Sequence, residues 1–248
     1  MDWQIIWLEA TGSTNDELHR LALQGAPAGT VIVADSQSSG RGRRGNTWVA
    51  PPGKCLLCSI LLRPEFSMDC WPRLTHAASL AMAQTLESLG LQAQIKWPND
   101  VYIAGRKICG ILLETFTSAG GGFVVLGFGL NVNVSAEEWP QNLATPATSV
   151  SLETGELAHR ESLLDNFLQH FEKVWPGVHQ HFSSILEAVE SRSFLTGHRI
   201  TLEIQGRVES GTACGLTPNG GLLFEDSQGV RREILTADTI RRVDGRAD

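Results

Sequence analysis

The sequence has no long apolar run, no secretory signal and no excess of positive charge, and each absence excludes a class of protein. No stretch approaches the roughly 20 consecutive apolar residues of a membrane helix. The amino terminus, MDWQIIWLEATG, lacks the basic start and apolar stretch of a signal peptide. The net charge of -7 over 248 residues argues against a protein whose main work is neutralising nucleic acid phosphates. We therefore expect a cytoplasmic globular protein without membrane attachment.

The cysteines also lack the spacing of a disulfide framework. Their number, five, is odd, which fits reduced thiols in a reducing compartment. Cys55 and Cys58 form a CxxC that could be a zinc site or a redox pair. The surrounding CLLCSILL predicts a strand, however, in which positions three apart point to opposite faces. Neither reading is favoured, and we predict no metal site.

The order of the predicted elements indicates an α+β fold with a mixed sheet in residues 1–197. Thr14 and Glu17 match a capping box, which predicts a helix over 14–24. Apolar spacing predicts a core-facing helix over 72–89. Short turns join several of the strands, which implies a largely antiparallel sheet and not a doubly wound one. The other predicted elements are strands at 30–34, 56–62, 94–97, 101–103, 107–116 and 123–134, and helices at 160–175 and 178–189.

Beyond Gly197 the chain changes to short strands separated by polar turns, which is typical of a small barrel. We place a domain boundary here, giving units of 1–197 and 198–248. The predicted strands of the second unit lie at 199–204, 208–216, 221–225, 231–235 and 240–243.

The segment GRGRRG at 40–45 concentrates three arginines between glycines. It matches the dinucleotide pattern GxGxxG, but that pattern must open a helix, and here Asn46-Thr47-Trp48 runs into Pro51-Pro52-Gly53. No GxxxxGK[ST] phosphate loop occurs elsewhere. Guanidinium groups on a compact backbone favour binding of phosphate or carboxylate. The alternative is a solvated basic loop.

Two further segments place charged side chains next to buried strands. In KWPND at 96–100, Pro98 holds Trp97 extended, and Asn99-Asp100 form a turn; alternatively this is only a turn with a packed tryptophan. Lys107 begins the strand KICGILLE, which is apolar on both faces. A lysine entering a buried strand needs an anionic partner, either a structural carboxylate or a ligand.

The strand GFGLNVN places Gly127, Gly129, Asn131 and Asn133 on one face. Glycine inside a strand costs stability, and close approach of a ligand or of another backbone is its usual reason. Close packing of the sheet on a helix explains the glycines equally well, but it does not favour the two asparagines beside them.

Together these segments resemble the biotin protein ligases. The matching motifs are STN at 13–15, GRGRRG at 40–45, KWPND at 96–100, RKICGILLE at 106–114 and GFGLNVN at 127–133, in the family's order. The resemblance implies a catalytic domain related to class II aminoacyl-tRNA synthetases, followed by a small SH3-like C-terminal domain. It also implies that MgATP converts biotin to biotinyl-5'-AMP and pyrophosphate, before biotin passes to a lysine of a carrier protein.

The resemblance also implies the roles of individual residues. It makes Lys107, Arg43 and Asp100 the catalytic candidates. The adenine contacts do not follow from the motifs, and Trp139 is a candidate apart from the resemblance. The implied ATP or adenylate contacts are Arg41, Arg43, Arg44, Asn99, Lys107 and Asn131. The implied biotin pocket consists of Ser13, Thr14, Gln37, Gly40, Arg41, Arg43, Trp48, Lys107, Gly110, Gly127 and Gly129.

Two departures from the family pattern qualify the expected activity. Larger members carry an N-terminal DNA-binding domain, whereas twelve residues precede Ser13 here, so we expect a ligase that does not bind DNA. Asn46 stands where relatives often have a basic residue. The expected partner is the biotin carboxyl carrier protein or another acceptor domain, and the expected state is a monomer or homodimer. A lipoate or octanoate ligase and a non-catalytic biotin-binding regulator are the alternatives.

Overall fold

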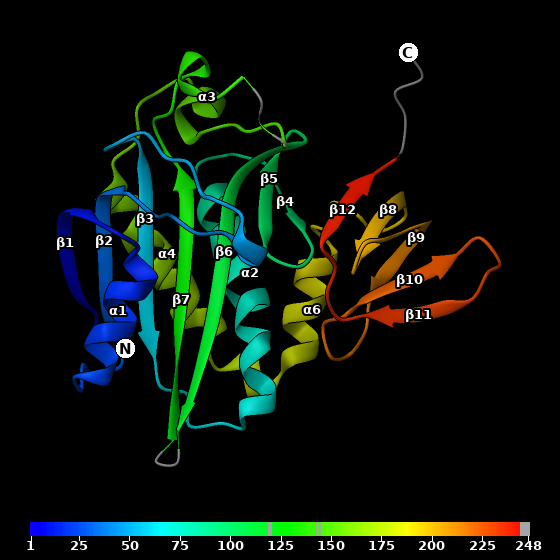
Figure 1. Cartoon of the computed structure of the whole chain (residues 1–248), viewed down its shortest axis with the longest axis horizontal. Helices are drawn as coiled ribbons and strands as arrows, with labels where there is room; N and C mark the ends of the chain where they lie inside the picture. Colours follow the sequence, from blue (N-terminus) through cyan, green and yellow to red (C-terminus); the bar gives the residue numbers. More distant parts are fainter. Residues whose placement is uncertain (119–120, 142, 144, 244–248) are drawn as a thin grey trace.

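The computed structural model describes residues 1–118, 121–141, 143 and 145–243, whose strands form two separate sheets (Figure 1). The larger sheet has the strand order β1-β2-β3-β7-β6-β5-β4. β1 and β2 are parallel, and the other neighbouring pairs are antiparallel, which confirms the predicted mixed, largely antiparallel sheet. Its strands are β1 (Gln4–Thr11), β2 (Thr30–Gln37), β3 (Cys55–Leu62), β4 (Ala93–Lys96), β5 (Asp100–Ile103), β6 (Arg106–Ser118) and β7 (Gly121–Asn131).

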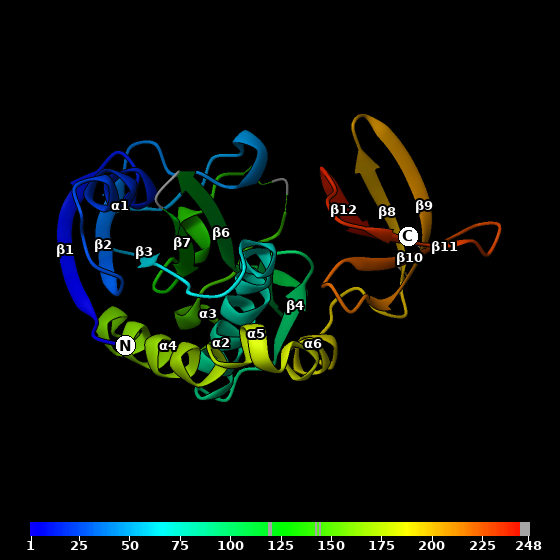
Figure 2. The ribbon, with the colours of Figure 1, turned by 90° about the horizontal axis from the view of Figure 1, so that it is seen from below.

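Helices cover both faces of this sheet, unequally (Figure 2). On one side lie α2 (Leu74–Glu87), α4 (Arg160–Val174), α5 (Gly177–Gln180) and α6 (Phe182–Glu190), and on the other lies α1 (Thr14–Leu23). The main core lies between the sheet and the larger helical layer, where Leu56, Phe128 and Phe167 are almost fully buried. Shorter helices are η1 (Arg43–Gly45), η2 (Met68–Arg73), η3 (Ala136–Glu138) and α3 (Val150–Thr154). Within the described part of the chain, no helix is long and apolar enough to cross a bilayer.

Strand β1 was not predicted from the sequence. It forms the edge of the sheet and pairs with β2 alone, and Ile5, Ile6 and Trp7 are all partly exposed. Because neither face of β1 is consistently buried, its sequence shows no apolar alternation of the kind that indicates a strand.

The two cysteines of the CxxC lie on opposite faces of β3, as predicted. Cys58 belongs to the main core, whereas Cys55 packs in a separate cluster with Leu57 and Val134. Burial raises the pKa of Cys55 to about 12 and that of Cys58 well above its usual value. Both side chains are therefore protonated thiols at neutral pH, and they cannot chelate one ion together.

The second sheet is antiparallel, with the strand order β11-β10-β9-β8-β12. Leu202, Ala213 and Phe224 form the centre of its own apolar cluster. This sheet agrees with the predicted run of short strands, while the boundary at 197/198 stays a prediction. Its strands are β8 (Arg199–Ile204), β9 (Arg207–Leu216), β10 (Leu222–Asp226), β11 (Arg231–Ile234) and β12 (Thr239–Arg242).

Two sets of hydrogen bonds fix the C-terminal sheet to the larger one. Just before β8, the backbone of Ile95 pairs with residues 192–194, with N–O distances of 2.7 and 2.9 Å. On the other side, the carbonyl oxygen of Gly220 accepts from Trp97 Nε1 at 2.9 Å and lies 3.0 Å from His76 Nε2. Both of these side chains are buried, so the contact does not exchange freely with water.

His76 makes the stability of this contact depend on pH. Burial lowers its pKa to about 4, while the Gly220 carbonyl opposes the shift. The unfolded chain takes up a proton near pH 6.5 and the folded chain does not, so the stabilisation is complete above pH 6.5 and is lost as the pH falls toward 4. Between pH 7 and pH 5 we expect the wild type to lose about 2 kcal/mol more unfolding free energy than His76→Gln. Urea unfolding of both proteins at the two pH values measures this difference, and equal losses would contradict it.

Candidate active site

A cleft of about 710 Å³ lies on the α1 side of the larger sheet and extends to the C-terminal sheet, a size typical of small-molecule sites. Strands β6 and β7, residues 40–48, the turn at 97–100 and strand β12 contribute to its walls. Figure 2 shows the blue turn η1, within residues 40–48, on the same side of the sheet as α1. All the predicted site residues line the cleft except Gly40. Gly40 packs against the backbone of Trp48, where a Cβ atom would lie 2.7 Å from the Trp48 carbonyl oxygen.

Glycines on paired strands form the floor of the cleft. Gly110 of β6 lies opposite Gly129 of β7 in the sheet register. A Cβ atom on Gly129 would come within 2.6 Å of Trp48 Nε1, and one on Gly127 within 2.9 Å of Asn15 Cγ. Close packing on a helix explains Gly127, which admits a side chain of α1, while Gly129 admits the indole of Trp48. The approach of a ligand to this face stays a prediction.

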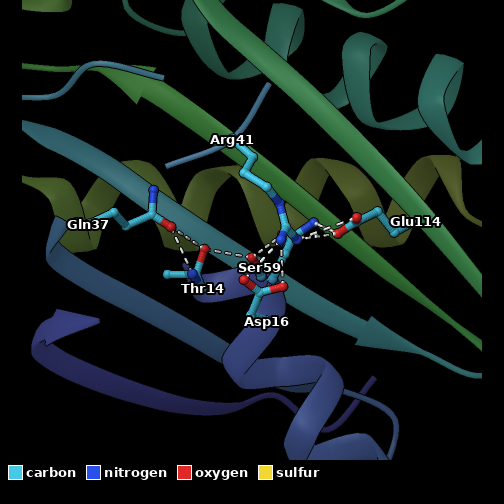
Figure 3. Close-up of polar contacts among 7 residues, drawn as sticks. Thr14, Asp16, Gln37, Arg41, Ser59 and Glu114 are labelled. Carbon is cyan, nitrogen blue, oxygen red and sulfur yellow. Dashed lines mark hydrogen bonds and ion pairs between the residues drawn. The ribbon is translucent and has the colours of Figure 1, made fainter. Parts of the chain in front are cut away.

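Three neutral polar side chains, Thr14, Gln37 and Ser59, bond to one another beside Arg41 (Figure 3), and Thr14 and Gln37 line the cleft. Gln37 Oε1 accepts from the backbone N of Thr14 at 2.7 Å and from its hydroxyl at 3.1 Å. Ser59 donates to Thr14 Oγ1 at 2.7 Å. The predicted capping box is wrong: the helix N-cap is Ser13, and no side chain caps it. The Thr14 hydroxyl is held on the cleft side by Gln37 and Ser59.

Arg41 is compensated by two carboxylates and is not directed toward a free anion site. Its guanidinium contacts Asp16 at 2.7 Å and Glu114 at 3.2 Å, as Figure 3 shows. Glu114 also accepts from Asn15 Nδ2 at 2.6 Å. The base of the arginine-rich segment is thereby tied to α1 and β6. Sequence analysis missed Glu114, whose only signal was an acidic residue in the otherwise apolar run KICGILLE.

Residues 40–48, which we call the basic loop, form a small hairpin. Arg41 and Thr47 form an isolated β-bridge, Gly42 N donates to Asn46 O at 2.7 Å, and Trp48 N donates to Gly40 O at 3.0 Å. Its tip is the short 3-10 turn η1, in which Arg44 has a φ of 56°. No helix follows, so the rejection of a dinucleotide fingerprint is confirmed.

Arg43 and Arg44, both at this tip, have different main partners. Arg43 lies in the cleft, and its Nη1 is 3.4 Å from Asn99 Oδ1. Burial lowers its pKa, as does the neighbouring charge of Arg44, and Asp100 opposes the shift. A partly buried guanidinium with only long hydrogen bonds can accept an anionic ligand without losing a strong partner. Arg44 instead contacts the C-terminal sheet.

Lys107 has the anionic partner that its position required. Its Nζ lies 2.7 Å from Asp100 Oδ1 and 5.5 Å from the centroid of the Trp48 ring. Its backbone is held from both sides, because Lys107 N donates to Pro146 O and Thr148 N donates to Lys107 O. The predicted partner of Lys107 was either a structural carboxylate or an anionic ligand, and the structure contains the carboxylate, that of Asp100. Both residues line the cleft, so the Lys107 ammonium can also contact a bound ligand.

Asn131 and Asn133 have mainly structural partners in this arrangement. The Asn131 amide is buried and donates to Thr148 O at 2.9 Å, while Asn133 bonds to the backbone of Ala158. Above the floor, the indole N–H groups of Trp48 and Trp139 are buried without an acceptor. Buried donors of this kind are rare in proteins, and both can donate to a ligand in the cleft.

Comparisons with known proteins agree on one family. The family model described as the biotin/lipoate A/B protein ligase family matches residues 7–131, which include the glycine floor and the basic loop. The bifunctional ligase/repressor BirA of Bacillus subtilis is 34% identical over 241 residues, covering 96% of this chain and 74% of that protein. The biotin–[acetyl-CoA-carboxylase] ligase of Paracoccus denitrificans is 31% identical, covering 93% and 97%. The structure of the Aquifex aeolicus biotin protein ligase with biotin and ATP superposes with a TM-score of 0.83 at 29% identity, covering 96% and 99%.

Proposed function

Because this chain belongs to the biotin/lipoate A/B protein ligase family and is a biotin–protein ligase, we propose that its cleft activates biotin with MgATP and then transfers it to a carrier lysine. The observation that carries this proposal is the combination of groups in one cleft. The neutral hydrogen-bonding groups of Thr14 and Gln37 and the cations Arg43 and Lys107 all line it. A neutral cyclic urea with a carboxylate tail matches this combination.

In the first step, a carboxylate oxygen of biotin attacks the α-phosphorus of ATP. A new P–O bond forms, the bond to the bridging oxygen breaks, and the electron pair leaves with pyrophosphate. Negative charge grows on the phosphoryl oxygens and on the leaving group, and fixed cations stabilise such charge because they need no reorganisation. Arg43 and Lys107 supply these cations, and the Trp48 indole covers the acid from above.

Magnesium would reach the cleft with the nucleotide. Among the described residues no three His, Cys, Asp or Glu side chains are placed to hold a metal ion, and Asp100 is already paired with Lys107. Mg²⁺ commonly keeps several waters and binds through phosphates plus one or two carboxylates. Asp100 is the carboxylate that could contribute, and the ion would supply charge neutralisation of the triphosphate.

In the second step, the neutral amine of a carrier lysine attacks the carbonyl carbon of biotinyl-5'-AMP. The amide C–N bond forms, the C–O bond to AMP breaks, and the amine loses a proton. Asp100 is the first residue of β5 and lies beside Asn99 and Lys107. Its carboxylate can accept that proton. The acceptor is the biotin carboxyl carrier protein or another cytoplasmic biotin-acceptor domain.

A competition assay tests the proposal against its two rivals. Purified protein is given MgATP, a carrier domain, and equal amounts of biotin and lipoate. We expect biotin on the carrier, with one pyrophosphate released per label. The reason is that the loop here is rich in arginine, whereas a more neutral segment is expected at this place in a lipoate ligase. Preferential lipoylation would favour the lipoate ligase, and biotin binding without pyrophosphate release would favour the regulator.

A further inference from the structure

Arg44 lines the cleft, but the hydrogen bond and the ion pair of its guanidinium go to the C-terminal sheet. Its Nη2 donates to Thr236 Oγ1 at 2.8 Å, and its guanidinium forms an ion pair with Asp238. Arg43 Nη2 lies 3.4 Å from the same Thr236 oxygen. The acidic and hydroxyl partners come from the segment between β11 and β12, almost 200 residues further along the chain.

Asp238 is held firmly by its own surroundings. Its Oδ2 accepts from the backbone N of Gln205 at 2.6 Å, and its backbone N donates to Glu203 O at 2.7 Å. The carboxylate is therefore oriented by the β8–β9 turn before it meets Arg44. Arg44 in turn has a left-handed backbone, which non-glycine residues rarely adopt without compensating contacts.

The segment that bears Asp238 is also fixed relative to the cleft floor. The C-terminal sheet is bonded to Ile95 of β4 and, through Gly220, to Trp97 and His76. The basic loop is consequently attached at two ends. Its base is paired with Asp16 and Glu114 of the catalytic unit, and its tip is paired with Thr236 and Asp238. Arg43 lies between these two attachments, facing Asn99.

We propose that Asp238 and Thr236 are positioning residues of the ligase. By holding Arg44 they keep the basic loop over the cleft, direct Arg43 toward the reacting phosphate, and slow the escape of the adenylate. The inference rests on the proposed function and deepens it, because it assigns the C-terminal sheet a part in the reaction. It also replaces the expectation that Arg44 binds phosphate with a role in closing the loop.

The test measures how long the protein retains its intermediate. Labelled biotinyl-5'-AMP is formed on the full-length protein with MgATP and then chased with unlabelled biotin. We expect release to be roughly tenfold faster in Asp238→Asn and in Arg44→Ala, the effect expected when a hydrogen bond to a charged group is lost. Thr236→Val should show a smaller increase. The double variant Arg44→Ala/Asp238→Asn should release no faster than Arg44→Ala alone, because both changes break one contact.

Three further measurements make the result decisive. Exchanging the charges in Arg44→Asp/Asp238→Arg should restore part of the retention, which a purely structural role would not predict. Glu209→Gln, which breaks the exposed ion pair with Arg232 elsewhere on the same sheet, is the matched control and should leave release unchanged. The proposal is overturned if Arg44→Ala weakens ATP binding while Asp238→Asn leaves both binding and release as in the wild type. A wild-type protein that forms no adenylate would instead refute the proposed function.

Discussion

Lys107→Met is expected to slow formation of biotinyl-5'-AMP by about 100- to 1,000-fold, the usual effect of removing one fixed group that stabilises transition-state charge. Methionine keeps the length and the apolar stem of lysine, but it removes the ammonium that lies 2.7 Å from Asp100 Oδ1. Without that charge, the biotin carboxylate is repelled by both the α-phosphate and the unpaired carboxylate of Asp100. Pyrophosphate release in a single turnover measures the step directly.

The uncompensated Asp100 could also weaken folding, and a second variant separates the two effects. In Lys107→Met/Asp100→Asn both charges are removed, so stability should return toward that of the wild type while adenylate formation stays slow. Arg106→Met is the matched control, because Arg106 is the neighbouring cation and pairs with Glu153 away from the cleft. Adenylate formation at the wild-type rate in Lys107→Met would remove Lys107 from the chemistry.

Sequence patterns predicted those parts of the site whose residues lie close together in the chain or on one strand. The common face of Gly127 and Gly129 follows from the two-residue period of a strand, and the structure places both at the cleft floor. The need of Lys107 for an acid followed from its burial, and Asp100, seven residues earlier, meets it across the β5–β6 pair.

The parts that the sequence did not predict depend on contacts between distant segments. Glu114 meets Arg41 and Asn15 only because β6 passes beside α1, and Asp238 meets Arg44 only because the C-terminal sheet is fixed next to the basic loop. Such pairs have no local period. Thr14 shows the related failure of a local rule: the sequence predicts that its hydroxyl caps α1, but in the folded protein this hydroxyl bonds to Gln37 and Ser59.

Gly129→Ala should disable the site with little effect on the fold. The new methyl group would lie 2.6 Å from Trp48 Nε1 and 2.8 Å from Cζ2, so the indole must move away from the floor. The backbone is not strained, because Gly129 lies within β7 and has no positive φ, and alanine replaces glycine in a strand without loss of conformational stability. We expect kcat/KM for biotin to fall at least about tenfold, the consequence of a misplacement near 1 Å at a reacting site.

Two variants distinguish this steric mechanism from a general loss of structure. Gly12→Ala is the matched control, because its added methyl meets no atom within 4 Å and its φ is not positive, and it should keep the wild-type kcat/KM. If the Trp48 indole is the group displaced, Trp48→Ala should lower activity on its own, and adding Gly129→Ala to it should cost little more, since the clashing ring is gone. Losses that multiply in the double variant would show that the methyl group obstructs the ligand itself, and that Trp48 is not the group whose position Gly129 controls.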